Sequence, residues 1–137
     1  METAFFANQV FTEKVEILEG ILTFENCVFE KGVCIKGDNR LYFLKGEGGH
    51  VIFKFCTFRS QDKKPCVMLW NRAQGEFYDC QMISENDAYY HIQFDTCFCI
   101  ETGSHGVFQR CSISYFGACA VLIMIGSSGL FEDCCFR

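Results

Sequence analysis

The chain has 137 residues, of which half are apolar, with 16 Phe, 11 Cys, a single Pro and a formal net charge of −5. This length and composition predict one folded domain over residues 1–137 and exclude a disordered chain. The acidic balance argues against sequence-independent binding to nucleic acid, which needs clustered Lys and Arg. No apolar run reaches the ~20 residues of a membrane-spanning helix, so we expect no membrane span.

The first 14 residues are irregular, and they lack the basic segment and long apolar core of a secretory signal. We expect residues 1–14 to form an N-terminal cap or an arm between subunits, ahead of a strand over residues 14–18. Aromatic side chains in this segment, together with one at the far end of the chain, are the expected interface residues: Phe5, Phe6, Phe11 and Phe136.

From residue 24 onward, one phrase recurs five times: Phe, two residues, Cys, one residue and an apolar residue. Successive copies begin 29, 24, 31 and 23 residues apart. Self-similarity at such a period is the sequence mark of a solenoid. The copies begin at Phe24, Phe53, Phe77, Phe108 and Phe131, and their cysteines are Cys27, Cys56, Cys80, Cys111 and Cys134.

Short apolar runs between the phrases predict further strands, because they are rich in β-branched and aromatic residues and are bounded by Gly or polar clusters. A second run follows each of the first four phrases, at residues 32–35, 66–70, 89–94 and 119–125. A third run, at residues 40–44 and 97–100, accounts for the two longer repeats. Each repeat is therefore expected to contain a strand, a corner, a strand, a turn and a strand. A β-trefoil or sandwich is the alternative.

The residue before each phrase cysteine is expected to form the corner. It is Asn26, Asp79 and Asp133 in three copies, and these residue types tolerate a left-handed backbone. Phe55 and Arg110 occupy the same position in the other two. Glycine stands two residues before the Phe in three copies, which suggests a turn leading into the strand. These glycines are Gly75, Gly106 and Gly129.

This pattern resembles the right-handed parallel β-helix superfamily, the pectate-lyase-like solenoids, over about residues 15–137. The resemblance implies an all-β chain of about four to five coils. Phe- and Cys-rich coils of this kind also resemble non-enzymatic viral β-helix proteins. Equivalent positions of successive coils lie about 4.8 Å apart, so the five phrase cysteines are expected to form a packed, reduced column. With no secretory signal, this indicates an intracellular, cytoplasmic protein or a virion component.

Enzymes of the resembled superfamily use clustered acids or paired carboxylates, and this chain offers few such groups. Gly103-Ser104-His105-Gly106 is superficially similar to a segment of the hydrolases, but no Asp pair accompanies it. The loose carboxylate candidates are Asp79 with Asp133 and Asp95 with Glu101. Cys97 and Cys99 share a strand face but are better explained as core residues. We therefore expect no enzyme activity, no catalytic residue, no metal and no cofactor.

Polar loops that follow the phrases are the expected contacts to a ligand or partner, because insertions in a solenoid gather on one face. Their residues are Gln61, Asp62, Lys63, Lys64, Glu85, Asn86 and Asp87. The sequence thus favours a non-catalytic structural or assembly module with protein partners. We expect a homo-oligomer, with a trimer packed flank to flank favoured, or a subunit of a larger assembly such as a viral capsid. A carbohydrate-binding or carbohydrate-cleaving β-helix is the alternative.

Overall fold

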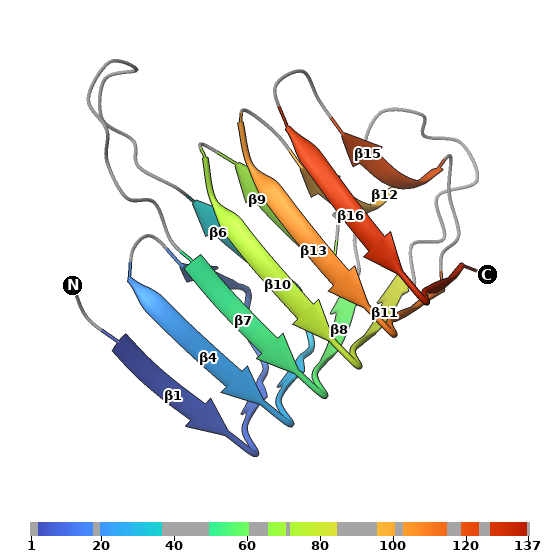
Figure 1. Ribbon diagram of the computed structural model, residues 1–137. Helices are drawn as coiled ribbons and strands as arrows, with labels where there is room; N and C mark the ends of the chain where they lie inside the picture. Colours follow the sequence, from blue (N-terminus) through green and yellow to red (C-terminus); the bar gives the residue numbers. More distant parts are fainter. Residues whose placement is uncertain are drawn as a thin grey trace.

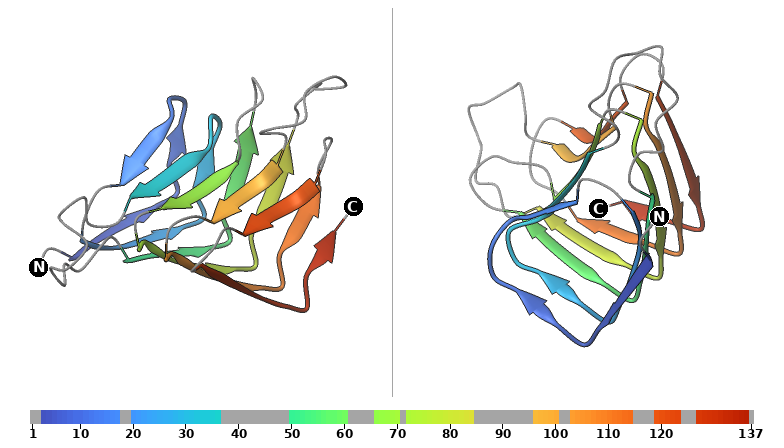
Figure 2. Two further views of the ribbon diagram at one scale, coloured as in Figure 1. Left: turned by 90° about the horizontal axis from the view of Figure 1, so that it is seen from above. Right: turned by 90° about the vertical axis from the view of Figure 1, so that its left-hand side faces the viewer.

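A computed structural model of the chain describes residues 3–17, 20–36, 50–60, 66–70, 72–84, 96–100, 103–114, 119–123 and 127–136. All regular elements in these ranges are β-strands, and they form three parallel sheets. The chain visits the sheets in strict rotation, so each turn of the chain adds one strand to each sheet in the same order (Figures 1 and 2). This parallel pairing differs from the antiparallel sheets of a sandwich or trefoil.

The three sheets are named A, B and C. Sheet A consists of β1 (Thr3–Ala7), β4 (Ile21–Glu25), β7 (His50–Lys54), β10 (Gln74–Tyr78), β13 (His105–Gln109) and β16 (Ser128–Glu132). Sheet B consists of β2 (Val10–Phe11), β5 (Val28–Phe29), β8 (Thr57–Ser60), β11 (Gln81–Ser84), β14 (Ser112–Ser114) and β17 (Cys135–Phe136). Sheet C consists of β3 (Val15–Ile17), β6 (Val33–Lys36), β9 (Val67–Trp70), β12 (Thr96–Ile100) and β15 (Cys119–Ile123).

Five turns of the chain supply a strand to every sheet, and a sixth supplies β16 and β17. The segment expected as a cap or arm supplies β1, β2 and the residues just before β3, and so continues the sheets toward the N-terminus. Residues 97–100, expected as an extra strand, lie in β12 and pair with β9 and β15 in sheet C. The runs at residues 40–44 and 89–94 lie outside the described residues.

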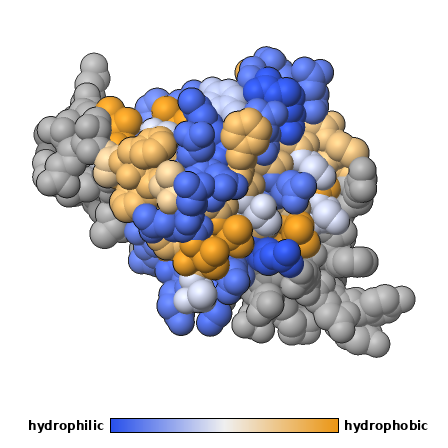
Figure 3. Space-filling model, turned by 90° about the horizontal axis from the view of Figure 1, so that it is seen from below, coloured by the Kyte–Doolittle hydropathy of each residue, from blue (hydrophilic) through white to orange (hydrophobic). Residues whose placement is uncertain are grey.

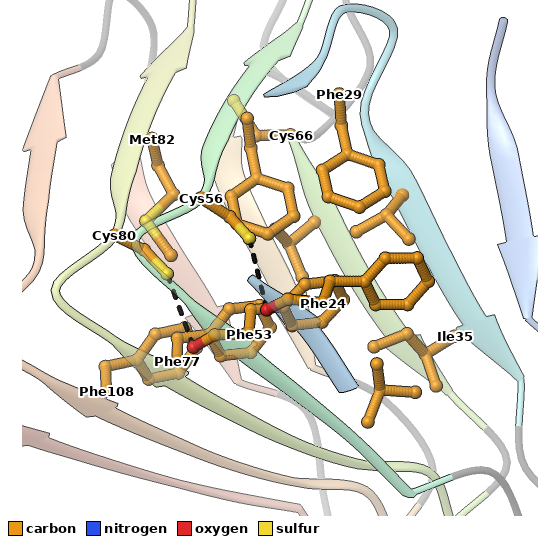
Figure 4. Close-up of a cluster of buried hydrophobic side chains, with 14 of the residues drawn as sticks. Phe24, Phe29, Ile35, Phe53, Cys56, Cys66, Phe77, Cys80, Met82 and Phe108 are labelled. Atoms are coloured by element: carbon orange, nitrogen blue, oxygen red, sulfur yellow. Dashed lines mark hydrogen bonds between the residues drawn. The ribbon is translucent and has the colours of Figure 1, made fainter. Parts of the chain in front are cut away.

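The phrase Phe residues form the predicted internal stack, and the first turn extends it by one ring. Phe6, Phe24, Phe53, Phe77, Phe108 and Phe131 lie face to face, with successive ring centroids 4.5 to 5.3 Å apart. A second stack in sheet B, of Phe11, Phe29 and Phe58, meets the first edge to face. Stacked and edge-to-face pairs are the two favoured aromatic geometries, so both stacks stabilise the interior (Figure 4).

The predicted corners are confirmed at all five phrases, where φ of the residue before Cys lies between 53° and 55°. Asn8 adopts the same conformation in the first turn, with φ of 58°. The prediction for the phrase glycines was wrong. Gly75, Gly106 and Gly129 lie inside β10, β13 and β16 rather than in turns. Gly75 and Gly106 are buried, and an added Cβ would come within 2.9 and 2.8 Å of the Phe77 and Phe108 rings.

Candidate interaction surfaces at the two ends of the stack

The N-terminal end of the stack is an open edge of all three sheets. Within the described residues, β1, β2 and β3 each pair with a strand on one side only. Phe5 and Val10 point outward from this turn and are 61% and 60% exposed. Phe6 and Phe11 face the interior and remain half-buried, each stacked on the ring of the next turn. This end therefore combines unpaired strand edges with apolar surface.

The C-terminal end carries the same two features. In the part of the chain that the structure describes, β16 and β17 pair only with β13 and β14. Leu130 and Phe136 are 52% and 45% exposed, and Cys135 is also exposed. The two ends lie at opposite sides of sheet A (Figure 1). Of the five large apolar residues that are exposed in the described part of the chain, four thus belong to the terminal turns, and the fifth, Phe55, is a corner residue.

A column of corner residues runs along the molecule from Asn8 to Asp133. Its members form contacts between turns: Asn26 Nδ2 donates to Asn8 Oδ1 at 2.7 Å, and Arg110 donates to both Asp79 oxygens at 2.8 and 3.0 Å. The hydrogen bond from Arg110 lowers the pKa of Asp79. Asp79 is therefore engaged in an ion pair, and Arg110 stands between it and Asp133 in the column, so these two carboxylates do not form a facing pair.

A polar cluster lies on the outer face of sheet A. The Glu76 carboxylate contacts His50 Nε2 and accepts a hydrogen bond from the Tyr78 hydroxyl at 2.6 Å. Partial burial alone would raise the pKa of Glu76, but the bonds from Tyr78 and His50 outweigh it and hold this pKa below its usual value. The hydrogen bond between Tyr78 and Glu76 also raises the pKa of Tyr78 to about 12. One carboxylate with two satisfied oxygens does not supply the acid and base pair of a glycosidase.

Gly103-Ser104-His105-Gly106 has a structural role in this fold. Ser104 is fully buried, and its Oγ accepts a hydrogen bond from the Ala73 backbone amide at 3.1 Å. His105 lies outside the coil and contacts Ser128 Oγ through Nδ1 at 2.5 Å. Gly103 has a left-handed φ of 70°, which explains why a glycine occupies the first position of the segment. The segment therefore connects neighbouring turns.

The phrase cysteines form the predicted column. Each thiol lies 3.4 to 3.8 Å from the carbonyl oxygen of the stacked Phe one turn earlier. Figure 4 shows this contact for Cys56 and Cys80. Hydrogen bonds with Cys111 and Cys56, together with burial, raise the pKa of the Cys80 thiol, and burial raises the pKa of Cys27 and Cys134. The five phrase cysteines and Cys135 are free thiols. The hydrogen bonds with Cys80 lower the pKa of the Cys56 and Cys111 thiols, so neighbouring thiols of the column shift in opposite directions.

The structure brings some of the predicted interface residues to the surface. Phe5 and Phe136 are exposed on the terminal turns, whereas Phe6 and Phe11 are half-buried. Val10 and Leu130 were missed, and the signal that could have found them is their alternation with inward-facing Phe11 and Phe131. The expected loop contacts at residues 61–64 and 85–87 lie outside the described residues, as do Asp95, Glu101 and the side chains of Cys97 and Cys99.

The described residues show neither a metal-binding cluster nor a membrane-spanning helix. They contain no group of three or more His, Cys, Asp or Glu side chains placed to bind a metal ion. They also contain no helix long and apolar enough to cross a membrane. Compared with known proteins, the chain matches no family model, no curated protein and no solved structure.

Proposed function

We propose that this chain is a non-catalytic structural module, a right-handed parallel β-helix that assembles with other copies of itself through its terminal turns. The observation that carries this proposal is the position of the exposed apolar residues. Phe5 and Val10 lie at one end of the stack, and Leu130 and Phe136 lie at the other. On the underside of the molecule, Figure 3 shows apolar groups at the surface among hydrophilic ones.

Right-handed coiling is supported by the parallel pairing of successive turns. Connections that return a chain to a parallel neighbour in the same sheet are right-handed in about 98% of cases, because a twisted strand packs back onto its sheet in that sense. Every pair of described strands is parallel and joins successive turns. The proposed coil therefore has a direction, with chemically different N- and C-terminal ends.

Open strand edges support an assembly function on physical grounds. An unpaired edge presents backbone donors and acceptors that pair readily with another strand. At both ends of this stack, such edges stand beside exposed apolar side chains. The flank-to-flank trimer that the sequence favours stays a prediction, whereas the exposed side chains favour contacts through the ends. Free buried thiols support a reducing compartment, so we place the protein inside the cell or in a virion.

Mass in solution tests this proposal. We expect light scattering at micromolar concentration to give a mass above that of one chain, and we expect Phe5→Ser with Phe6→Ser to lower it. Because Phe6 belongs to the internal stack, Phe5→Ser alone is the sharper variant. Phe55→Ser is the matched control, since Phe55 is 60% exposed but lies away from both ends. A wild-type protein that is monomeric at every concentration would show the proposal to be wrong.

A further inference from the structure

We propose that copies of this chain join head to tail: β16 and β17 of one copy pair with β1 and β2 of the next, in the register used between turns. This inference rests on the proposed assembly function and names its partner, a second copy in one defined orientation. The interface continues sheets A and B across the junction. In sheet C, β15 is the last described strand, and the proposed contacts are confined to sheets A and B.

The register within one copy predicts the contacts across the junction. In sheet A, each turn places its third and fourth strand residues over their equivalents, as in Val107 on Leu130 and Phe108 on Phe131. One more step of the same register places Phe5 opposite Leu130 and Phe6 opposite Phe131. In sheet B it places Val10 opposite Cys135 and Phe11 opposite Phe136. All four exposed apolar residues of the terminal turns then meet an apolar or thiol partner.

The internal Phe stack also supports head-to-tail joining. Within one copy the stack begins at Phe6 and ends at Phe131. A head-to-tail junction joins these two rings and makes the stack continuous. If two N-terminal ends met instead, the strands would run antiparallel, and pairing centred on Phe5 would set Phe6 opposite Ala4. That register interrupts the stack, whereas the head-to-tail register continues it.

The corner column adds a polar contact of the same orientation. Asn8 Oδ1 accepts from Asn26 of the following turn, and the amide nitrogen of Asn8 is a donor that a residue across the open edge can use. The corner residue that a head-to-tail partner places there is Asp133. An amide donor beside a carboxylate makes a charge-assisted hydrogen bond. This junction is heterologous, so it produces linear assemblies whose mass grows with concentration.

A disulfide trap tests the register directly, because one of its two cysteines is already in place. Val10→Cys puts a thiol opposite the exposed Cys135 of the next copy. Parallel neighbours about 4.8 Å apart are within the Cα separation of a disulfide. Within one copy the two positions are five strand steps apart in sheet B, about 24 Å, so they cannot form a bond. Any disulfide between residues 10 and 135 therefore joins two copies.

We expect mild oxidation of Val10→Cys to give a ladder of multimers on a non-reducing gel and a disulfide-linked peptide pair containing residues 10 and 135. Adding Cys135→Ser should remove that pair. Val28→Cys is the matched control, because Val28 occupies the same row of sheet B one turn further in. It should give no link to residue 135.

A charge introduced at the Asn8 corner gives an independent measurement of the junction. Asn8→Asp keeps the acceptor for Asn26 and a residue type that the corner already accepts, but it sets two carboxylates together at the junction. We expect it to weaken association about two- to fivefold. Asn8→Arg should strengthen association by reproducing the Asp79–Arg110 pair. Light scattering over a concentration series measures both.

The outcomes separate the two proposals. If the chain assembles, but oxidation yields no link between residues 10 and 135 and Asn8→Asp leaves the mass unchanged, the head-to-tail register is wrong and the assembly function stands. If the chain is monomeric at every concentration and no link between residues 10 and 135 forms, both are wrong.

Discussion

The corner residues show how single side chains tolerate an unfavourable backbone conformation. Six equivalent residues have φ between 53° and 58°, a region that Asn and Asp enter more readily than other residues with a Cβ. Arg110 adopts this conformation while its guanidinium makes two hydrogen bonds to Asp79. Phe55 adopts it with a ring that is 60% exposed. Phe55 is therefore the corner where the residue type fits the backbone least.

Phe55→Asn should stabilise the protein by about 1 kcal/mol, because Asn populates the left-handed region at lower cost. Urea denaturation measures the change, with the free energy of unfolding rising for this variant. Phe55→Ala is the control: it removes the exposed ring but keeps a Cβ and lacks the amide, so its gain should be smaller. Equal effects of Asn and Ala would mean that Phe55 destabilises the fold through its exposed ring and not through its backbone conformation.

Tyr78 should titrate late because its hydroxyl proton is held by the Glu76 carboxylate. Its folded pKa of about 12 exceeds the usual value of about 10. This raised pKa stabilises the fold fully below about pH 10, and that contribution is lost as the pH rises through about 12. Phenolate absorbance, taken as the difference between wild type and Tyr78→Phe, should show the late titration. Glu76→Gln should return the transition toward pH 10, and an unchanged transition would contradict the assigned hydrogen bond.

At the scale of the strands, the outcome for the glycines shows what the repeat alone could not predict. Gly75 and Gly106 each stand two residues before a stacked Phe, but the reason for a glycine there depends on a strand that is distant in sequence. Leu69 of β9 reaches across the interior to within 3.2 Å of where either Cβ would stand. The spacing of the phrase contains no information about that contact, so a packing requirement was interpreted as a turn.

Gly106→Ala should destabilise the fold by about 1–3 kcal/mol, because the new methyl group overpacks the space between Phe108 and Leu69. Thermal or urea unfolding would show the loss. Gln74→Ala is a suitable control, since Gln74 is exposed at the start of the neighbouring strand β10 and its truncation should be nearly neutral. A neutral Gly106→Ala would contradict the close packing at this position.

Regular spacing also explains which parts of the fold were predictable. The Phe stack, the Cys column and the corners follow from residues at fixed positions in one phrase, and the structure confirms all three. The first turn of the coil was not predicted, because Gln9 replaces the phrase cysteine and Phe6 precedes Phe24 by only 18 residues. The cluster of His50, Glu76 and Tyr78 was also missed, since His50 and Glu76 are neighbours only once the register of β7 and β10 is known.

At the scale of the whole molecule, the reactivity of the column cysteines should reveal the order in which the turns of the stack unfold. Each turn contacts mainly the turns before and after it, so stability in such an array is close to a sum of turn and interface contributions. The terminal turns have one neighbour each, and Cys134 is only partly buried, whereas Cys80 lies inside the stack. Opening should therefore begin at the ends and reach the centre last.

Thiol labelling under native conditions, at a concentration low enough to keep the chain monomeric, should accordingly show a gradient along the column. We expect exposed Cys135 to label at once, Cys134 next, and Cys80 more slowly than either, as followed by mass spectrometry of peptides. A buried thiol reacts only after its turn has opened, when its pKa is that of an exposed thiol, so the rates compare opening free energies and not native reactivities. Low urea concentrations should accelerate Cys134 less steeply than Cys80, because local fraying exposes less surface than opening of the central turns. If Cys80 and Cys134 instead labelled at one common rate with one urea dependence, the stack would open as a single cooperative unit and the picture of sequential fraying would be wrong.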